Sequence, residues 1–145
     1  MGLLGRFRKK RETLQVKEAK KITTDFEEFC GKDKDVYEAL YKLMFLDPRK
    51  IKTSMSEAEE KAKLFEKQKD VQEARIWYDI AGGLAIYEGD VEKVKKYFGK
   101  SAKLSSEMGY PILKIPEKAV KKASEYYRKI FREEDFRKMV AEEKA

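Results

Sequence analysis

Apolar side chains recur along this chain at the three- and four-residue spacing of α-helices, and no stretch alternates with the two-residue period of a strand. The pattern predicts an all-α protein of six or seven helices, joined by short turns as antiparallel hairpins. The predicted helices are residues 12–30, the segment after Asp35, a helix beginning near Glu57, residues 70–88, residues 90–107, a helix opened by Pro116, and a short segment over residues 133–145.

The predicted helix ends carry residues that satisfy free backbone groups. Four acceptor side chains are each followed three residues later by glutamate, which is the spacing of a capping box. These pairs are Thr24 with Glu27, Asp35 with Glu38, Ser56 with Glu59, and Asp70 with Glu73. Asp90 is predicted to cap the following helix, and Gly89 suits the left-handed position that ends the helix before it. Asp47 and Pro48 predict a stop followed by a new start.

The segment from Met108 to Pro116 is the one irregular linker in the pattern. Tyr110, Ile112 and Leu113 make it too apolar for a solvated loop. We therefore expect these three side chains either to fold back onto the core or to contact a protein partner.

Residues 75–104 are the most organised part of the chain. Tyr78 and Gly82 lie on the first predicted helix, Glu88–Asp90 forms the turn, and Phe98 follows sixteen residues after Gly82. This arrangement resembles one tetratricopeptide-type helix–turn–helix unit. Valine and serine stand where that family prefers alanine, and no equivalent unit recurs 34 residues away. The resemblance implies a helical bundle or short solenoid that binds peptides or proteins.

Two adjacent glycines, Gly82 and Gly83, interrupt this helical pattern. Each costs about 1 kcal/mol relative to alanine in a helix interior. We expect a close helix approach at these positions to compensate for that cost.

The net charge of +7 is concentrated at the N-terminus. Residues 1–21 carry eight basic side chains against Glu12 and Glu18, so the rest of the chain is almost neutral. The eight are Arg6, Arg8, Lys9, Lys10, Arg11, Lys17, Lys20 and Lys21. Such a cluster repels itself unless an anion is near. We expect residues 1–11 to form a basic arm that orders on binding, and residues 12–145 to form a single α-helical domain.

Two smaller basic patches lie within the helical part, and both are candidate nucleic-acid contacts. The first is a ridge with helical spacing, formed by Lys93, Lys96, Lys100 and Lys103. The second follows Pro116 and contains Lys118, Lys121, Lys122, Arg128, Lys129 and Arg132, with Tyr126 and Tyr127 nearby. An acidic tract over residues 25–38 contrasts with them. Either patch can equally be a solvated helix face.

These charges favour a ribosome- or RNA-associated protein, because basic side chains gain affinity for phosphates through counterion release. The start of the chain, MGLLGRFRKKRE, together with the lysine-rich body, resembles small archaeal ribosome-silencing proteins. That resemblance implies contact with ribosomal RNA and ribosomal protein of the 30S subunit, a homodimer, and a block of subunit joining. The high content of charged residues, 42% with no histidine, is typical of hyperthermophiles.

Two other interpretations stay open. In one, the helical repeat is a protein-interaction adaptor and the basic arm is incidental. In the other, Leu3, Leu4 and Phe7 form a weak amphipathic membrane anchor beside the basic residues. Phe7, which stands among the arginines, is also a candidate partner contact in the RNA-binding interpretation.

The residues that usually carry catalysis or hold metal are scarce. Histidine is absent, and the Gly82-Gly83 pair lacks the Lys and Ser/Thr of a phosphate loop. Cys30 is the single cysteine and is expected to be a small buried apolar residue. We therefore expect a non-enzymatic cytoplasmic protein with no catalytic residues, no metal and no cofactor.

Overall fold

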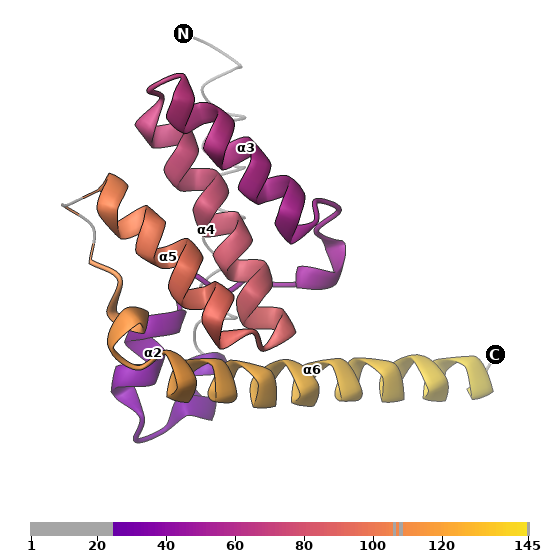
Figure 1. The fold of residues 1–145 in the computed structure, drawn as a ribbon. Helices are drawn as coiled ribbons and strands as arrows, with labels where there is room; N and C mark the ends of the chain where they lie inside the picture. The colour runs from indigo at the N-terminus through magenta and orange to yellow at the C-terminus, as the bar shows by residue number, and fades with distance from the viewer. Residues whose placement is uncertain (1–24, 106, 108, 145) are drawn as a thin grey trace, which may run out of the picture.

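The computed structural model describes residues 25–105, 107 and 109–144, and every regular element within them is a helix (Figure 1). The elements are a helical segment over residues 25–30, α2 (Lys34–Leu40), the 3-10 helix η1 (Pro48–Lys50), α3 (Met55–Lys67), α4 (Val71–Glu88), α5 (Val91–Leu104), the 3-10 helix η2 (Pro111–Lys114) and α6 (Pro116–Lys144). The all-α prediction is confirmed. The boundary between an arm at residues 1–11 and a domain at 12–145 lies outside the described residues.

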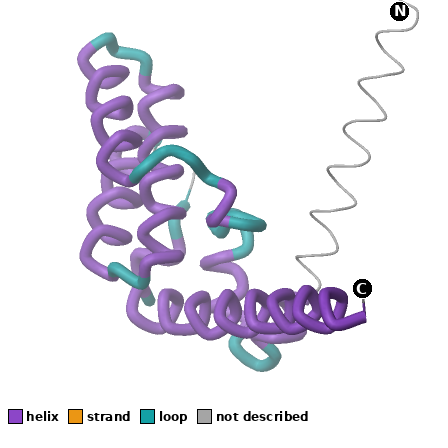
Figure 2. Tube along the Cα trace, turned by 90° about the vertical axis from the view of Figure 1, so that its right-hand side faces the viewer, coloured by secondary structure: helices purple, strands orange, loops and turns teal. Residues whose placement is uncertain are grey.

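Helices α3, α4 and α5 form a layer of antiparallel neighbours with α4 in the middle (Figures 1 and 2). Helix α6 crosses the end of this layer at which α4 ends, and it contacts both α4 and α5. Helix α2 packs against α6 and η2. The second half of α6 extends beyond the layer of α3, α4 and α5 (Figure 1). This half of the helix therefore lies outside the core.

Short-range caps explain where the middle helices begin and end. Asp70 Oδ1 accepts a hydrogen bond of 3.3 Å from the Glu73 amide, and Asp90 Oδ1 accepts one of 3.1 Å from the Lys93 amide. Gly89 adopts the left-handed conformation with φ of 75° and ends α4. These three predictions are confirmed.

Two predicted caps are wrong. The cap of α3 is Ser54, which accepts a hydrogen bond of 3.1 Å from the Glu57 amide, so the cap lies two residues before the predicted cap at Ser56 and the helix begins at Met55. Helix α2 begins at Lys34 after Asp33, and Asp35 lies inside its first turn. Both errors arose because two acceptor residues stand two positions apart and sequence spacing alone does not select between them.

Three predicted segment lengths also differ. The stretch after Pro48 forms only a three-residue 3-10 helix before α3. Helix α5 ends at Leu104 instead of about Glu107. The separate segment predicted over residues 133–145 is instead the continuation of α6, because no glycine or proline interrupts the sequence between residues 116 and 144.

The glycine pair on α4 is crowded by aromatic rings. A Cβ atom on Gly82 would lie 2.5 Å from Phe98 Cζ, and one on Gly83 would lie 2.6 Å from Phe45 Cε2. Phe98 is fully buried and belongs to α5, while Phe45 lies in the loop after α2. The predicted close approach is therefore present at both glycines, although the ring at Gly83 comes from a loop.

The linker between α5 and α6 folds back onto the core. Tyr110 is 8% exposed, Ile112 is fully buried, and Leu113 is half-buried against the same cluster. Within this core the Tyr110 hydroxyl donates to both carboxylate oxygens of Asp79, at 3.1 and 3.2 Å, and burial raises the pKa of Asp79. Cys30 is buried as expected, and burial raises the pKa of its thiol to about 11.

Candidate nucleic-acid interface

The predicted lysine ridge lies on the exposed side of α5. Lys93, Lys100 and Lys103 are exposed and form no ion pair within the part of the chain that the structure describes. Lys96 differs, because its Nζ lies 2.8 Å from Glu59 Oε1 on α3. Three of the four ridge lysines therefore carry positive charge that no carboxylate of the described chain neutralises.

The first turns of α6 are electrostatically paired with the acidic tract. Lys118 Nζ lies 3.2 Å from Asp35 Oδ2 and 3.7 Å from Asp33 Oδ1. Lys122 Nζ lies 3.6 Å from Asp33 Oδ2 and 5.0 Å from the centre of the Phe29 ring. Two of the predicted nucleic-acid contacts thus hold α6 against the segment before and within α2, whereas the exposed Lys121 has no such pair among the described residues.

A first hollow, of about 600 Å³, lies between the end of α4 and the side of α6 that faces it. Its lining residues are Tyr87, Glu88, Ser124, Tyr127, Arg128, Phe131, Arg132 and Asp135. Arg128 and Arg132 are exposed, one helical turn apart, and neither forms an ion pair within the described residues. Tyr87 is 37% exposed, so its ring is accessible at this hollow.

The aromatic ring that is accessible beside this patch is not one of the two predicted from the sequence. Tyr126 and Tyr127 are 6% and 3% exposed, since both face the core. The accessible ring is Tyr87, which lies edge-to-face with Tyr127 at 5.5 Å and with Phe131 at 6.2 Å between ring centres. Sequence reasoning missed Tyr87 because it stands 41 residues before Arg128 and only the packing of α4 on α6 brings them together.

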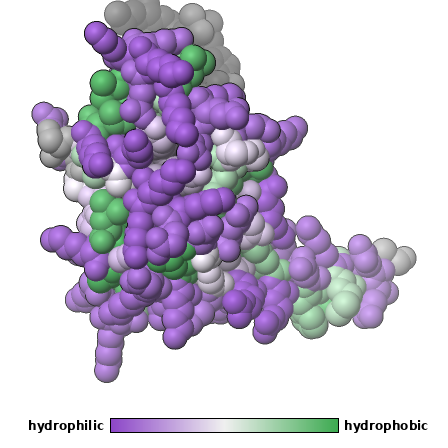
Figure 3. All heavy atoms as spheres, viewed as in Figure 1, coloured by the Kyte–Doolittle hydropathy of each residue, from purple (hydrophilic) through white to green (hydrophobic). Residues whose placement is uncertain are grey.

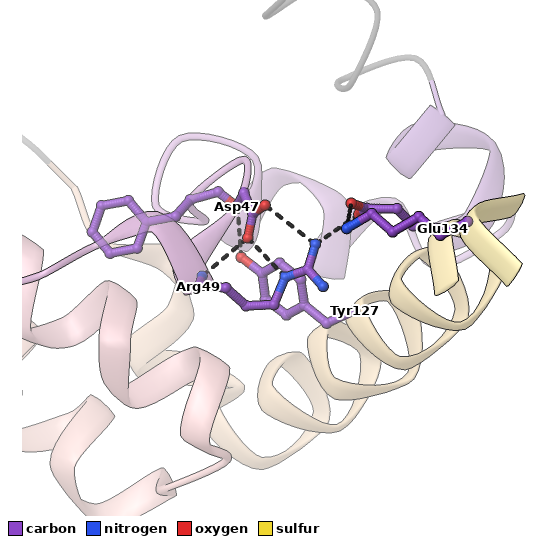
Figure 4. A network of polar contacts seen from close by, with 6 residues as sticks. Asp47, Arg49, Tyr127 and Glu134 are labelled. Carbon is purple, nitrogen blue, oxygen red and sulfur yellow. Dashed lines mark hydrogen bonds and ion pairs between the residues drawn. The ribbon is translucent and has the colours of Figure 1, made fainter. Parts of the chain in front are cut away.

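A network of polar contacts around Arg49 of η1 lies beside this hollow (Figure 4). The Arg49 guanidinium donates to Asp47 Oδ1 at 3.1 Å and to Glu134 Oε2 at 2.6 Å, and it lies 3.8 Å from the centre of the Phe131 ring. Hydrogen bonding to Arg49 lowers the pKa of both Asp47 and Glu134. The Tyr127 hydroxyl donates to the Phe45 carbonyl at 2.7 Å. Phe131 is therefore in contact with both Tyr127 and Arg49.

A second hollow, of about 360 Å³, follows the first along α6. It is lined by Arg132, Glu133, Phe136 and Arg137, so Arg132 borders both hollows. Phe136 and Met139 are 61% and 53% exposed. Figure 3 shows hydrophobic side chains gathered on this projecting end of α6.

The remaining candidate residues divide into two groups. Phe7 and the eight basic residues from Arg6 to Lys21 lie outside the described residues. Tyr110, Ile112 and Leu113 are described, and the first two are buried in the chain's own core. Partner contact through them would require the linker to leave that core.

The described residues contain no group of three or more acidic or cysteine side chains placed to hold a metal ion. Their buried tyrosine hydroxyls connect helices: Tyr97 donates to Glu59 at 2.8 Å, and Tyr78 donates to Glu66. None of the described helices is long and apolar enough to cross a membrane.

No protein-family model, curated protein or solved structure matches this chain. What the chain binds is therefore inferred from its own residues and their geometry.

Proposed function

We propose that this chain is a non-enzymatic RNA-associated protein that binds through the basic outer faces of α5 and α6. The observation that carries the proposal is a set of exposed basic side chains without ion pairs among the described residues. They are Lys93, Lys100 and Lys103 on α5, and Lys121, Arg128 and Arg132 on α6. A protein stabilised mainly by surface ion pairs would neutralise such side chains with its own carboxylates, as Lys96 and Lys118 are neutralised here.

Phosphate is the anion class that suits this surface. Each basic side chain that neutralises a phosphate releases a condensed counterion, so binding weakens steeply as salt concentration rises. Arginine adds a planar guanidinium that can donate two hydrogen bonds to one phosphate. The basic residues from Arg6 to Lys21 belong to the same proposal and would add further phosphate contacts.

We propose ribosomal RNA and protein of the small subunit as the target, in a cytoplasmic role that pairs subunits and prevents subunit joining. The support for this choice is the resemblance of the first twelve residues and the lysine-rich body to archaeal ribosome-silencing proteins. A homodimer is part of that proposal.

For the architecture we propose a tetratricopeptide-like unit over residues 75–104. Its support is the packing of the fully buried Phe98 ring directly over Gly82, sixteen residues earlier. The alternative function, a protein-interaction adaptor built on this unit, predicts that binding is insensitive to RNase.

A sucrose gradient of lysate from cells that produce the full chain tests the proposed function. We expect the protein to migrate with small subunits or subunit pairs, and RNase or deletion of residues 1–21 to return it to the top. Replacing Lys93, Lys100 and Lys103 by Gln should also weaken comigration. The matched control replaces Lys52, Lys67 and Lys69, which are exposed elsewhere and lack ion pairs among the described residues. A wild-type protein that stays at the top at low salt would contradict the proposal.

A further inference from the structure

We propose that the surface of α6 around Arg132 is a track for unpaired RNA bases. One base lies against Tyr87 in the first hollow, and another base of the same strand lies against Phe136 in the second. Arg128, Arg132 and Arg137 line the track and contact the phosphates. This inference rests on the proposed RNA-binding function and specifies the form of RNA that the surface takes.

The first argument is the exposure of aromatic rings beside arginine. Tyr87 and Phe136 are 37% and 61% exposed, and each lines a hollow that also contains Arg132. A ring that is exposed next to unpaired cations offers a stacking surface that accepts any base. Stacked and paired bases inside a duplex cannot reach such a ring, so the ligand must present bases that are free of the stack.

The second argument is the spacing of the two hollows. Phe131 borders the first hollow and Phe136 borders the second, five residues further along a continuous helix. At about 1.5 Å and 100° per residue, this separation is roughly 7.5 Å along the axis and 140° around it. Successive bases in a duplex are only about 3.4 Å apart along each strand. The two hollows therefore fit a strand that passes around α6 at Arg132, with its bases splayed into separate hollows.

The third argument is the rigidity of the first hollow. Phe131 has Tyr127 stacked on it at 5.7 Å between ring centres, and Arg49 lies 3.8 Å from its centre. Phe131 is therefore packed by two side chains of the chain itself, so it serves as a wall. This leaves Tyr87 as the ring on which a base can stack, against a wall that is already in place before RNA arrives.

Two carboxylates border the first hollow, and they define where the phosphate can lie. Glu88 and Asp135 are exposed acceptors among the lining residues. Carboxylates accept hydrogen bonds from the N–H groups of bases but repel phosphate. The base therefore enters the hollow beside Tyr87 and Glu88 on α4, and the phosphate stays with Arg128 and Arg132, which outnumber Asp135 on the α6 side.

Equilibrium binding of the full chain to two labelled RNAs tests the track. The probes are an unstructured 12-nucleotide oligoadenylate and a 12-base-pair RNA duplex, compared at one low salt concentration. We expect Phe136→Ala and Tyr87→Ala each to weaken binding of the single strand about tenfold. Neither should change duplex binding by more than about twofold. Arg128→Gln with Arg132→Gln should weaken binding of both RNAs.

The control variant is Leu64→Ala with Val71→Ala, which removes two exposed apolar side chains at the far end of the α3–α4 layer. It should bind both RNAs as the wild type does. Phe136→Ala keeps the test independent of folding, because this side chain projects from α6 outside the core. Normal RNA binding by both aromatic variants would overturn the track and leave the proposed function standing. A wild-type chain that binds neither RNA would overturn both.

Discussion

Gly82 and Gly83 are neighbours on α4, but the two aromatic rings above them differ in their freedom to move. Phe98 lies fully buried between α4 and α5, so it cannot shift without disturbing the core. Phe45 is half-buried in a loop, so it can move by a few tenths of an ångström. The same added methyl group should therefore have a larger effect at Gly82 than at Gly83.

We predict that Gly82→Ala lowers the free energy of unfolding by about 1–2 kcal/mol. Overpacking a core typically lowers the free energy of unfolding by about 1–3 kcal/mol. The better helix propensity of alanine offsets up to about 1 kcal/mol of this loss. Gly83→Ala should cost less, because the ring above it can shift. Urea denaturation followed by circular dichroism measures both changes.

Gly99 on α5 is the matched control for this prediction. A Cβ atom there would meet nothing within 4 Å. Gly99→Ala should therefore raise the free energy of unfolding by about 0.5–1 kcal/mol through helix propensity alone. Equal effects at Gly82 and Gly99 would mean that Phe98 does not crowd Gly82.

At the scale of the helices, Glu59 ties α3 to α5 across α4. Its carboxylate accepts hydrogen bonds from Lys96 and from the Tyr97 hydroxyl, both at 2.8 Å, and it also pairs with Lys63 at 3.1 Å. Hydrogen bonding to Lys96, followed by that to Tyr97, lowers the pKa of Glu59 from 4.5 to about 2. This residue should therefore contribute to the acid sensitivity of the fold.

We predict that Glu59→Gln lowers the free energy of unfolding at pH 7 by about 1–2 kcal/mol. A carboxylate with a depressed pKa stabilises the fold above about pH 4.5, and this contribution is lost as the pH falls toward 2. The variant should therefore lose less stability than the wild type over that pH range. Urea denaturation at several pH values measures the difference.

The matched control for Glu59 is Glu60→Gln, the next residue along α3, whose side chain is exposed and makes no hydrogen bond or ion pair among the described residues. It should leave the pH profile close to that of the wild type. A Glu59→Gln profile parallel to the wild-type profile would show that the charge of Glu59 does not stabilise the helix layer.

Local sequence signals predicted the elements that depend on local chemistry. Asp70, Asp90 and Gly89 fixed the ends of α4 and the start of α5, because a cap or a left-handed residue acts within one helical turn. The same rules failed at Asp35 and Ser56, where a second acceptor residue stood two positions away. The continuity of α6 was missed because its apolar stripe changes face once the helix leaves the core.

The candidate site was predicted only in part, since its members come from distant parts of the chain. The α5 lysines were predicted from helical spacing, which is a local property. The pairing of Lys118 with Asp35 spans 83 residues and removes a predicted contact. The Arg49 contact with Glu134 spans 85 residues and sets the wall of the first hollow. Tertiary packing determines both of these contacts, and no local sequence pattern predicts either of them.

At the scale of the whole molecule, basic residues of α6 fall into two groups: one group pairs with carboxylates of the described chain, and the other does not. The first turns of α6 meet the acidic tract through Lys118 and Lys122. The other group contains Arg128 and Arg132, beside the exposed Tyr87. Acidic residues that would weaken RNA binding are thus partly neutralised by lysines of the chain itself, while Arg128 and Arg132 stay available for phosphate.

The salt dependence of RNA binding tests this account most directly. The affinity of the full chain for small-subunit ribosomal RNA would be measured across a range of salt concentrations. The comparison variant replaces six basic residues by Gln: Lys93, Lys100, Lys103, Lys121, Arg128 and Arg132. At about 0.7 released counterions per contact, the slope of log K against log salt should become shallower by roughly 4. An unchanged slope in a folded variant would contradict phosphate binding by these helices.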